Sequence, residues 1–472
     1  MGLPVTLGEL RRSGYPDRSV KEELCQNLLE RLAEAGGPSE PGEIFDSIIG
    51  YGHSVLPVLE RGILAGHDLI LLGERGQAKT RLIRNLPELL DPEIPAVAGC
   101  EINDHPYRPI CAACRALVAD RGDETPLSWI GRDARYAEKL ATPDTSVADL
   151  IGDVDPIRVA EGRYLADEMT IHYGLIPRTN RGIFSINELP DLPERIQVAL
   201  FNLLEERDIQ IRGYKIRLPL DLLVVATANP EDYTHRGRII TPLKDRFGTQ
   251  LRTHYPADAA SEIRIMDQEA KLPPTGPPVF IPHFLKEILA ELTQQLRRSP
   301  QINQRSGVSV RYSIGNMETM VASALRRAVR AGEPRAVPRP VDLWTVIDGS
   351  IGRIEFEVME EGREERILEQ ALRRAVAEIY RRRLGGENLS TLVALFEEGL
   401  VIETSDLLSA ENFLAQFSSV PGLGRIMRRL DVAEESPQAA AAALELALEG
   451  LHLSKRLNKE GRRTGAWQFG AP

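Results

Sequence analysis

The fold of this chain is decided by the stretch Asp68-Leu-Ile-Leu-Leu-Gly-Glu-Arg-Gly-Gln-Ala-Lys-Thr-Arg-Leu-Ile-Arg-Asn-Leu86. Its apolar run Leu69–Leu72 predicts a short buried strand, and Gly73 predicts a tight turn after it. Lys79 and Thr80 then begin a segment in which the apolar residues have helical spacing. A strand, a glycine-containing loop, Lys-Thr and a helix follow one another in this order in the phosphate-binding P-loop.

The P-loop order assigns a role to each part of the segment. Backbone N–H groups of such a loop, and of the helix that follows it, surround the phosphates of a nucleotide. Lys79 adds a positive charge at the β- and γ-phosphates, and the Thr80 hydroxyl helps to hold Mg²⁺. The residues expected to bind the nucleotide are Gly73, Glu74, Arg75, Gly76, Gln77, Ala78, Lys79, Thr80 and Arg81.

Ala78 departs from the motif G-x-x-x-x-G-K-[ST], because it stands where the second glycine belongs. A methyl group there must fit a backbone that often requires glycine, although Gly76 still relieves the loop. We therefore expect nucleotide binding to persist in weakened form. The alternative interpretation is a glycine-rich turn that precedes a helix by chance.

Composition narrows the class of protein. A chain of 472 residues with 42% hydrophobic and 27% charged residues is ordinary for a globular protein of about two to four domains. The net charge of −11 does not suggest a nucleic-acid-binding surface. We see no secretion signal, no apolar run of membrane-spanning length and too few cysteines for a disulfide framework, so we expect a cytoplasmic protein.

Breaks in composition and periodicity divide the chain into four regions. These are a helical N-terminal segment at 1–40, an α/β core at 41–258 with a cysteine-containing insertion at 100–135, a helical lid at 270–383, and a helical C-terminal region at 384–472 that ends in a frayed basic tail. Alternating strands and helices predict a parallel sheet in the core. Its expected strands are Leu69–Leu72, Ala96–Cys100, Gly182–Asn187, Leu220–Thr227 and Gln250–His254.

The third expected strand ends in Asn187-Glu188. P-loop ATPases usually have Asp-Glu here, where the Asp assists the metal and the Glu activates the attacking water. Glu188 keeps the carboxylate of the base, whereas Asn187 offers Mg²⁺ an amide oxygen without charge, so we expect weaker metal binding. The alternative is that Asn187-Glu188 only ends a strand.

Four further residues are candidates for sensing the nucleotide. Asn229 follows the fourth strand and would position the attacking water. Arg238 or Arg246 would reach the γ-phosphate of a neighbouring subunit as an arginine finger, although Arg246 could instead pair with Asp245. Arg311 would read the γ-phosphate from the start of a lid helix; the alternative is an Arg that faces solvent.

The segment after the second expected strand contains three of the four cysteines. Cys111 and Cys114 have the C-x-x-C spacing of a zinc knuckle, and Cys100 with His105 would complete a tetrahedral, structural Zn²⁺ site. The pattern lacks a second close pair of ligands. The alternative is three reduced thiols in a loop.

Taken together, these motifs resemble the AAA+ ATPases of the magnesium-chelatase I-subunit and MoxR branch. The likeness is carried by a segment at about 141–175 similar to the helix-2 insert, by 174–182 before the third strand, by the helix 197–207, by a hairpin at 208–219 like the one before sensor 1, by Asn229 as sensor 1, and by Asp245-Arg246-Phe247. The resemblance implies an AAA+ core with a five-stranded parallel sheet, a helical lid and a homo-oligomeric ring, expected to be hexameric, with nucleotide between subunits. It also implies a partner protein with a von Willebrand A domain.

The leading hypothesis is therefore an ATPase that hydrolyses ATP to ADP and phosphate, with Mg²⁺, and remodels a partner protein. Ala78 and Asn187 suggest slow turnover, and they favour a rival hypothesis, a nucleotide-gated assembly scaffold that rarely hydrolyses ATP. A DNA-associated motor is disfavoured by the net charge of −11. Porphyrin chemistry is not indicated by any residue pattern in the chain.

Overall fold

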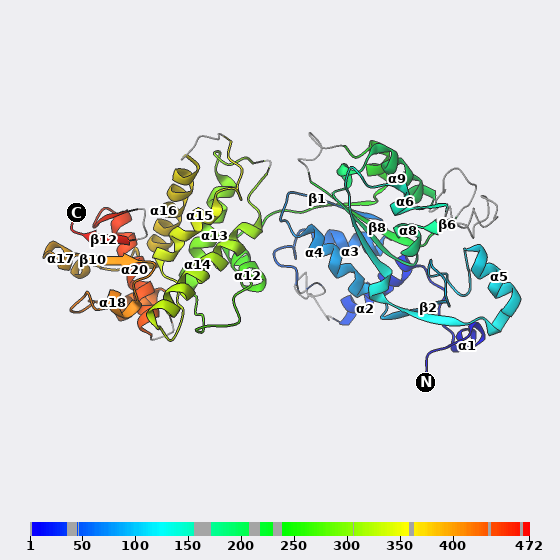
Figure 1. The fold of residues 1–472 in the computed structure, drawn as a ribbon, viewed down its shortest axis with the longest axis horizontal. Coiled ribbons are helices and arrows are strands. Elements are labelled where there is room, and N and C mark those ends of the chain that lie inside the picture. The colour runs from blue at the N-terminus through cyan, green and yellow to red at the C-terminus, as the bar shows by residue number, and fades with distance from the viewer. Residues whose placement is uncertain are drawn as a thin grey trace. The chain divides into compact units, whose positions relative to one another are not determined.

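The computed structural model describes residues 2–34, 45, 47–154, 171–206, 218–229, 238–304, 306–357, 363–432, 436–462 and 466–472. The chain forms two compact units, Met1–His254 and Tyr255–Pro472 (Figure 1). Each unit has its own helices, strands and core, and each is described by itself.

The first unit is built on a five-stranded sheet with the strand order β4-β7-β8-β1-β9. All four pairings between neighbouring strands are parallel. The carboxyl ends of all five strands therefore lie along one edge, where α/β proteins bind ligands. The strands are β4 (Tyr136–Leu140), β7 (Gly182–Asn187), β8 (Leu222–Ala228), β1 (Leu69–Leu72) and β9 (Thr249–Arg252). The expected α/β class and parallel sheet are confirmed.

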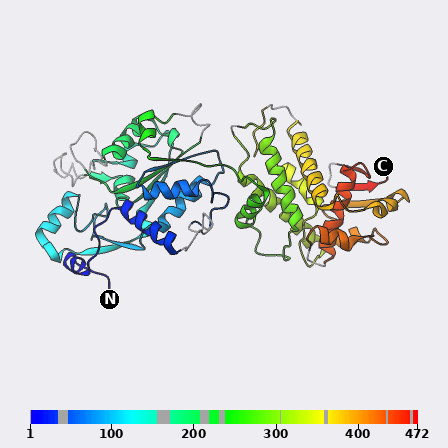
Figure 2. The ribbon, with the colours of Figure 1, turned by 180° about the vertical axis from the view of Figure 1, so that it is seen from behind.

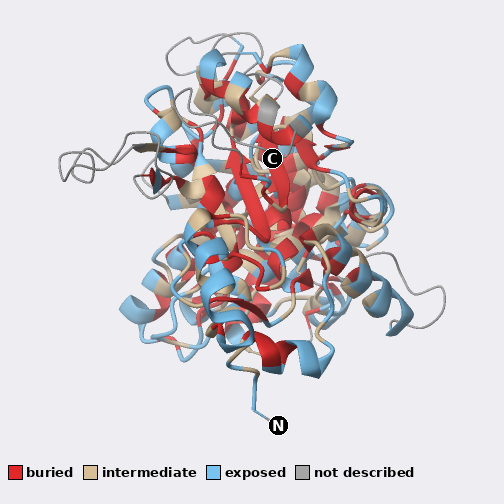
Figure 3. Ribbon diagram, turned by 90° about the vertical axis from the view of Figure 1, so that its right-hand side faces the viewer, coloured by how far each residue is buried: buried red, intermediate tan, exposed pale blue. Residues whose placement is uncertain are grey.

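Both faces of this sheet are covered, so its central strands are apolar along their whole length. Alternate residues of β1 show the division: Leu69 and Leu71 belong to one core cluster, and Ile70 belongs to the other. Figure 3 shows the buried residues concentrated on these strands. The first face is covered by α2 (Val20–Glu34), α3 (Leu56–Leu64) and α4 (Lys79–Asn85), and the second by α6 (Val147–Leu150), α8 (Leu175–Arg178), α9 (Glu194–Glu206) and α11 (Thr241–Arg246).

The prediction of the second core strand was wrong. The expected strand Ala96–Cys100 overlaps β2 (Glu93–Val97), which pairs antiparallel with β3 (Leu127–Gly131) in a separate two-stranded sheet. The edge of the core sheet is formed instead by β4, which contains Glu138 and Lys139 and is only partly buried. An edge strand with one half-open face has no continuous apolar run, so its sequence gave no strand signal.

The N-terminal segment packs on the insertion. The Leu7 amide donates to the Thr125 carbonyl over 3.0 Å, and the Leu127 amide donates to the Val5 carbonyl over 2.9 Å. The Trp129 indole donates to the Pro4 carbonyl over 2.8 Å. These contacts join α1 (Leu7–Ser13), the short turn η3 (Gly122–Glu124) and β3 into one substructure, in which α5 (Ala112–Arg121) carries the C-x-x-C pair.

Two segments that carry the family resemblance are described only in part. The segment expected to be the helix-2 insert contains α6 and the antiparallel pair β5 (Gly152–Val154) and β6 (Ile171–Tyr173), while 155–170 lie outside the described residues. Of the expected hairpin at 208–219, residues 208–217 also lie outside them. The remaining short turns of this unit are η2 (Leu86–Leu89), η4 (Arg132–Arg135) and η6 (Leu189–Asp191).

The second unit is mainly helical. Its apolar core is formed largely by helices, which confirms the expected helical region after the α/β core. The helix α20 (Pro437–Leu453) packs against α16, α18 and α19 (Figure 2). The other helices are α12 (Ala259–Glu269), α13 (His283–Arg298), α14 (Val310–Ala331), η7 (Pro340–Trp344), α15 (Thr345–Ser350), α16 (Arg363–Leu384), α17 (Ser390–Glu397), α18 (Ala410–Leu414) and α19 (Leu423–Arg429).

The expected frayed basic tail is instead part of a sheet. The strands β10 (Ile402–Ser405), β12 (Ala466–Gly470) and β11 (Asn458–Arg462) form an antiparallel sheet in that order. Phe469 is fully buried, and the Lys459 ammonium pairs with Glu449 and lies 4.5 Å from the centre of the Trp467 ring. Aromatic burial and a paired lysine order this end of the chain, so counting its basic residues was misleading.

Within the parts of the chain that the structure describes, no helix is both long enough and apolar enough to cross a membrane.

Candidate functional site

The loop between β1 and α4 has a fixed shape. The Gly73 amide donates to the Ala228 carbonyl over 3.2 Å, which ties the loop to the end of β8. The Gln77 side-chain oxygen accepts from the Glu74 amide over 3.0 Å and from the Thr253 hydroxyl over 2.8 Å. A Cβ atom on Gly73 would lie 1.9 Å from the Thr253 oxygen. Only glycine fits at position 73, because this hydrogen-bonded framework occupies the space of a side chain.

Ala78 adopts a left-handed backbone conformation, with φ of 53° and ψ of 16°. It directly precedes α4, so it is the residue at which the chain turns from the loop into the helix. An L-residue other than glycine is strained in this region by roughly 1–2 kcal/mol. The glycine of the usual motif would adopt this left-handed conformation without strain. The replacement of that glycine by Ala78 therefore costs conformational free energy.

The Lys79 ammonium is buried and donates hydrogen bonds to three acceptors of the site. It donates to the Gly73 carbonyl, to the Glu74 carbonyl over 2.7 Å, and to the Asn229 side-chain oxygen over 2.7 Å. Lys79 is 9% exposed and Asn229 is 4% exposed. A buried ammonium is stable only when its donors are satisfied, so these contacts hold the cation between the loop and the end of β8.

The end of β7 carries the other expected catalytic pair. Asn187 is buried and its side-chain amide nitrogen donates to Glu138 of β4. The Thr227 hydroxyl donates to the Asn187 side-chain oxygen over 3.4 Å and accepts from the Glu188 amide over 3.0 Å. Glu188 is half-buried and has a positive φ of 57°. Strained backbone of this kind recurs at functional sites.

Glu138 is a residue of this site that the sequence did not reveal. Its carboxylate accepts from the Arg84 guanidinium over 2.9 Å and from the Tyr136 hydroxyl over 3.0 Å, besides Asn187. Burial acts to raise the pKa of Glu138, but these hydrogen bonds and the Arg84 charge hold that pKa below its ordinary value. The role of Glu138 could not be predicted from the sequence, because β4 was not recognised as a strand of the core sheet.

Other residues of the loop and helix lie at the rim of this site. Thr80 and Arg81 are half-buried at the start of α4, Glu74 and Gly76 are half-buried in the loop, and Arg75 is exposed. Their assignment to nucleotide binding stays a prediction. The Tyr51 hydroxyl donates to the Gln77 or His254 carbonyl, each 2.8 Å away, so Tyr51 supports the loop from beneath.

The three arginines proposed as sensors differ in their surroundings. Arg246 of α11 pairs with Glu205 over 2.7 Å and lies 5.3 Å from the centre of the Phe201 ring, so the alternative partner Asp245 is not the one observed. Arg238 is exposed. Arg311 is exposed near the start of α14 in the second unit. Their roles as arginine finger and sensor stay predictions.

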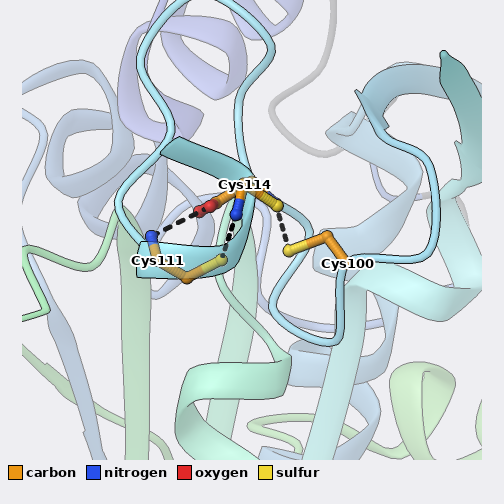
Figure 4. Close-up of side chains that lie close together, drawn as sticks. Cys100, Cys111 and Cys114 are labelled. Atoms are coloured by element: carbon orange, nitrogen blue, oxygen red, sulfur yellow. Dashed lines mark hydrogen bonds between the residues drawn. The ribbon is translucent and has the colours of Figure 1, made fainter. Parts of the chain in front are cut away.

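The cysteine segment forms a compact cluster in which Cys100, Asp104, Cys111 and Cys114 each contribute one potential ligand atom. Figure 4 shows the three cysteines of this cluster close together. These four atoms all lie within 4.8 Å of one another. The backbone supports them: the Cys114 amide donates to the Cys111 sulfur over 3.3 Å, and the Asp104 amide donates to the Cys100 sulfur over 3.4 Å. This cluster could hold a metal ion.

His105, the fourth ligand expected from the sequence, is not part of this cluster. Its Nδ1 accepts from the Tyr107 amide over 3.1 Å, and its Nε2 lies 3.5 Å from the Asp17 carboxylate. Burial and the nearby Arg181 charge lower the pKa of His105 to about 3. Asp104 is the residue that faces the sulfur atoms. It is fully buried, and its Oδ1 has no hydrogen-bond partner.

A cavity of about 200 Å³ borders this cluster. Its lining includes Cys100, Cys111 and Cys114 together with Ile171 and Tyr173 of β6. The three cysteines therefore border a cavity on one side of the cluster.

Comparison with known proteins gives one family model and several relatives. The model of the Sigma-54 interaction domain matches residues 160–246. A magnesium-chelatase subunit ChlI homologue of Methanocaldococcus jannaschii is 27% identical over 201 residues, which is 42% of this chain and 51% of that protein. The magnesium-chelatase subunit ChlI of Euglena gracilis is 23% identical over 325 residues, 64% of this chain and 87% of that protein. The chaperone MoxR1 of Mycobacterium tuberculosis is 23% identical over 178 residues, 33% of this chain and 46% of that protein.

Solved structures give weaker matches. A structure of the complex between subunits BchI and BchD of magnesium chelatase matches with a TM-score of 0.35 at 20% identity, covering 70% of this chain and 99% of that one. NtrX from Brucella abortus in complex with ATP matches with a TM-score of 0.35 at 13% identity, covering 74% of this chain and 72% of that one.

Among the sequence relatives, the chain spans about half the length of the ChlI homologue of Methanocaldococcus jannaschii.

Proposed function

We propose that this chain, an AAA+ protein related to the magnesium-chelatase I subunit and to MoxR, binds ATP with Mg²⁺ and hydrolyses it to ADP and phosphate. The observation that carries the proposal is the position of Lys79. Its ammonium lies between the loop carbonyls and Asn229, at the carboxyl edge of a parallel sheet. This is the edge at which α/β folds bind phosphorylated ligands.

The residues present fit a nucleotide. The shape of the loop from Gly73 to Ala78 is set by the hydrogen bond between Gln77 and Thr253, with no side chain at position 73. The loop leads into the N-terminus of α4, where backbone N–H groups favour an anion. Lys79 would exchange its carbonyl acceptors for phosphate oxygens. Bound Mg²⁺ would neutralise charge on the phosphates.

The hydrolytic step would use residues from two strand ends. Glu188, which directly follows β7, would accept a proton from the attacking water, and Asn229, which directly follows β8, would orient that water. Both side chains stand at the same edge as Lys79, since β7 and β8 pair in parallel and end together. Thr80 and Asn187 would assist the metal.

A ring would complete the site. We propose that the chain assembles into a homo-oligomer, expected to be hexameric, in which Arg246 or Arg238 of one subunit meets the nucleotide of the next and Arg311 contributes from the second unit. Arg246 is 41% exposed at its side chain although it pairs with Glu205, so it is available at a surface. The BchI–BchD complex suggests a partner protein, and the family resemblance suggests one with a von Willebrand A domain, on which the ring would act as a remodelling motor.

The rival is a scaffold that binds ATP but turns it over rarely. The left-handed conformation of Ala78 and the missing charge at Asn187 favour it. The buried Lys79–Asn229 contact and the retained Glu188 favour hydrolysis.

Nucleotide binding is tested with Lys79→Ala and with Lys271→Ala as a control, since Lys271 is an exposed lysine of the second unit. ATP affinity measured by calorimetry should be lost in Lys79→Ala and kept in Lys271→Ala. Equal ATP affinity in both variants and the wild type would remove the P-loop assignment.

The cysteine cluster supports a second proposal, a structural Zn²⁺ held by Cys100, Cys111, Cys114 and Asp104. Zinc–sulfur bonds of about 2.3 Å in a tetrahedron place ligand atoms roughly 3.8 Å apart, and the four atoms here already lie within 4.8 Å of one another. The ion would pin the insertion beneath the N-terminal segment.

A further inference from the structure

We propose that Glu138 supplies, from β4, the negative charge that Asn187 lacks, so that the two side chains together hold the Mg²⁺ of a bound nucleotide. This inference rests on the ATP binding proposed above and names a residue for it that the sequence motifs do not contain. A carboxylate on the neighbouring strand would thus replace the aspartate that P-loop ATPases usually carry at position 187.

Strand register places the two side chains on the same face of the sheet. In the parallel pair of β4 and β7, Glu138 lies opposite Ser185 and Leu140 lies opposite Asn187. Opposite residues in adjacent strands point to the same face, and so do residues two positions apart. Glu138 therefore lies on the same face of the sheet as Asn187, opposite the residue two positions before it in β7.

That face is the one covered by α4, the helix of the P-loop. Ile183 of β7, which shares the face with Ser185 and Asn187, packs in the same core cluster as Leu82 and Ile83 of α4. Arg84 of α4 reaches across to Glu138 with hydrogen bonds of 2.9 Å and 3.2 Å. Helix and carboxylate are therefore in direct contact.

Thr80 lies on the same side of α4 as Arg84, because residues four apart are neighbours on a helix surface. It is one turn closer to the helix N-terminus, and hence closer to the loop and to the strand ends where Asn187 lies. The hydroxyl expected to bind Mg²⁺ is thus on the side of α4 that carries Arg84, the residue in contact with Glu138.

The contacts of Glu138 keep it ionised. It accepts hydrogen bonds from Arg84, Tyr136 and Asn187, and its side chain is 20% exposed. The Asn187 amide nitrogen donates to this carboxylate, and the Asn187 oxygen accepts from the Thr227 hydroxyl. A charged oxygen ligand on β4 is thus hydrogen-bonded to the residue that ends β7, and the Asn187 side chain would have to rotate for its own oxygen to reach the same ion.

Arg84 would compete with Mg²⁺ for the Glu138 carboxylate. Its side chain is 62% exposed, so its ion pair with Glu138 is weakly held, and Mg²⁺ would draw the carboxylate away from it. Arg84→Gln therefore makes a matched control for Glu138→Gln, since each variant removes one partner of the same ion pair but only Glu138→Gln removes the carboxylate.

The experiment measures how strongly Mg²⁺ improves binding of a fluorescent ATP analogue to the full chain, as the ratio of its Kd in EDTA to its Kd in Mg²⁺. Glu138→Gln should lower this ratio by about 10- to 100-fold, the usual effect of losing a supporting metal contact. Arg84→Gln should keep or raise it. The double variant Glu138→Gln/Asn187→Asp exchanges the positions of carboxylate and amide and should restore it.

The outcomes separate this inference from the function on which it rests. If Glu138→Gln leaves the ratio within twofold of wild type while Lys79→Ala abolishes binding of the analogue, Glu138 has no role and the nucleotide site stands. If Lys79→Ala also binds normally, the nucleotide site itself is wrong. A ratio that falls equally in Glu138→Gln and Arg84→Gln would show that the ion pair matters only for structure and would overturn the inference.

Discussion

Lys79 at the start of α4 and Asn229 at the end of β8 are joined by a hydrogen bond of 2.7 Å between the ammonium and the side-chain oxygen. The contact links residues 150 positions apart in the chain. It places the two groups that would meet the γ-phosphate and the attacking water within one buried cluster.

Replacing Asn229 separates its two expected roles. Asn229→Asp would pair its carboxylate with Lys79 and repel phosphates, so ATP affinity should fall about tenfold or more, since a hydrogen bond to a charged group is worth about 1.5–3 kcal/mol. Asn229→Ala should keep most of the affinity and slow hydrolysis instead. Calorimetry and a phosphate-release assay distinguish the two variants, and equal loss of affinity in both would contradict the assignment.

Ala78→Gly should remove backbone strain. The left-handed conformation of Ala78 costs roughly 1–2 kcal/mol, and the greater freedom of glycine in the unfolded chain returns about 0.5–1 kcal/mol of that. We expect a net stabilisation of about 0.5–1 kcal/mol in urea unfolding, together with tighter ATP binding. Ala116→Gly, at an exposed position within α5, should destabilise the chain by a similar amount, because there the alanine is helical.

The cysteine cluster predicts a specific pattern of metal content. Protein purified without chelator should contain about one zinc per chain by elemental analysis, and Asp104→Ala should lower that content. His105→Ala, one residue away, should retain the zinc because its ring faces Asp17 and Tyr107. Loss of zinc in His105→Ala but not in Asp104→Ala would restore the ligand set first expected from the sequence. Absence of zinc from the wild type would leave the cluster as reduced thiols.

His105 also predicts a pH dependence of stability. Burial and Arg181 lower its pKa from 6.5 to about 3, so the unfolded chain binds a proton between these values and the folded chain does not. Its contribution to stability is complete above pH 6.5 and is lost as the pH falls toward 3, by about 2 kcal/mol at pH 5. Urea unfolding at pH 7 and pH 5 should show a smaller difference in His105→Gln than in wild type. Exposed His283→Gln should leave the difference unchanged.

The sequence predicted the centre of the sheet well because β1, β7 and β8 are buried on both faces and therefore read as continuous apolar runs. It missed β4, because an edge strand with Glu138 and Lys139 has no such run. Glu138 was missed for the same reason: its importance depends on the pairing of β4 with β7, which joins residues far apart in the chain.

Local spacing favoured His105 over its neighbour Asp104 as the fourth ligand of the cysteine cluster. His105 lies one position closer than Asp104 to the C-x-x-C pair, and His is the more frequent zinc ligand. The backbone turn between Cys100 and Cys111 decides which side chain faces the sulfur atoms, and it directs Asp104 toward them. At the C-terminus, Lys459 suggested a solvated tail, whereas its ammonium lies against aromatic rings and Glu449.

Turnover of ATP through Glu188 is the property on which the proposed function depends. Steady-state ATP hydrolysis should be measured for wild type and Glu188→Gln, with oligomer size followed by light scattering in the same samples. We predict turnover in wild type, loss of turnover in Glu188→Gln, and ATP-dependent assembly in both. Assembly with no turnover in either protein would contradict hydrolysis through Glu188 and favour the scaffold.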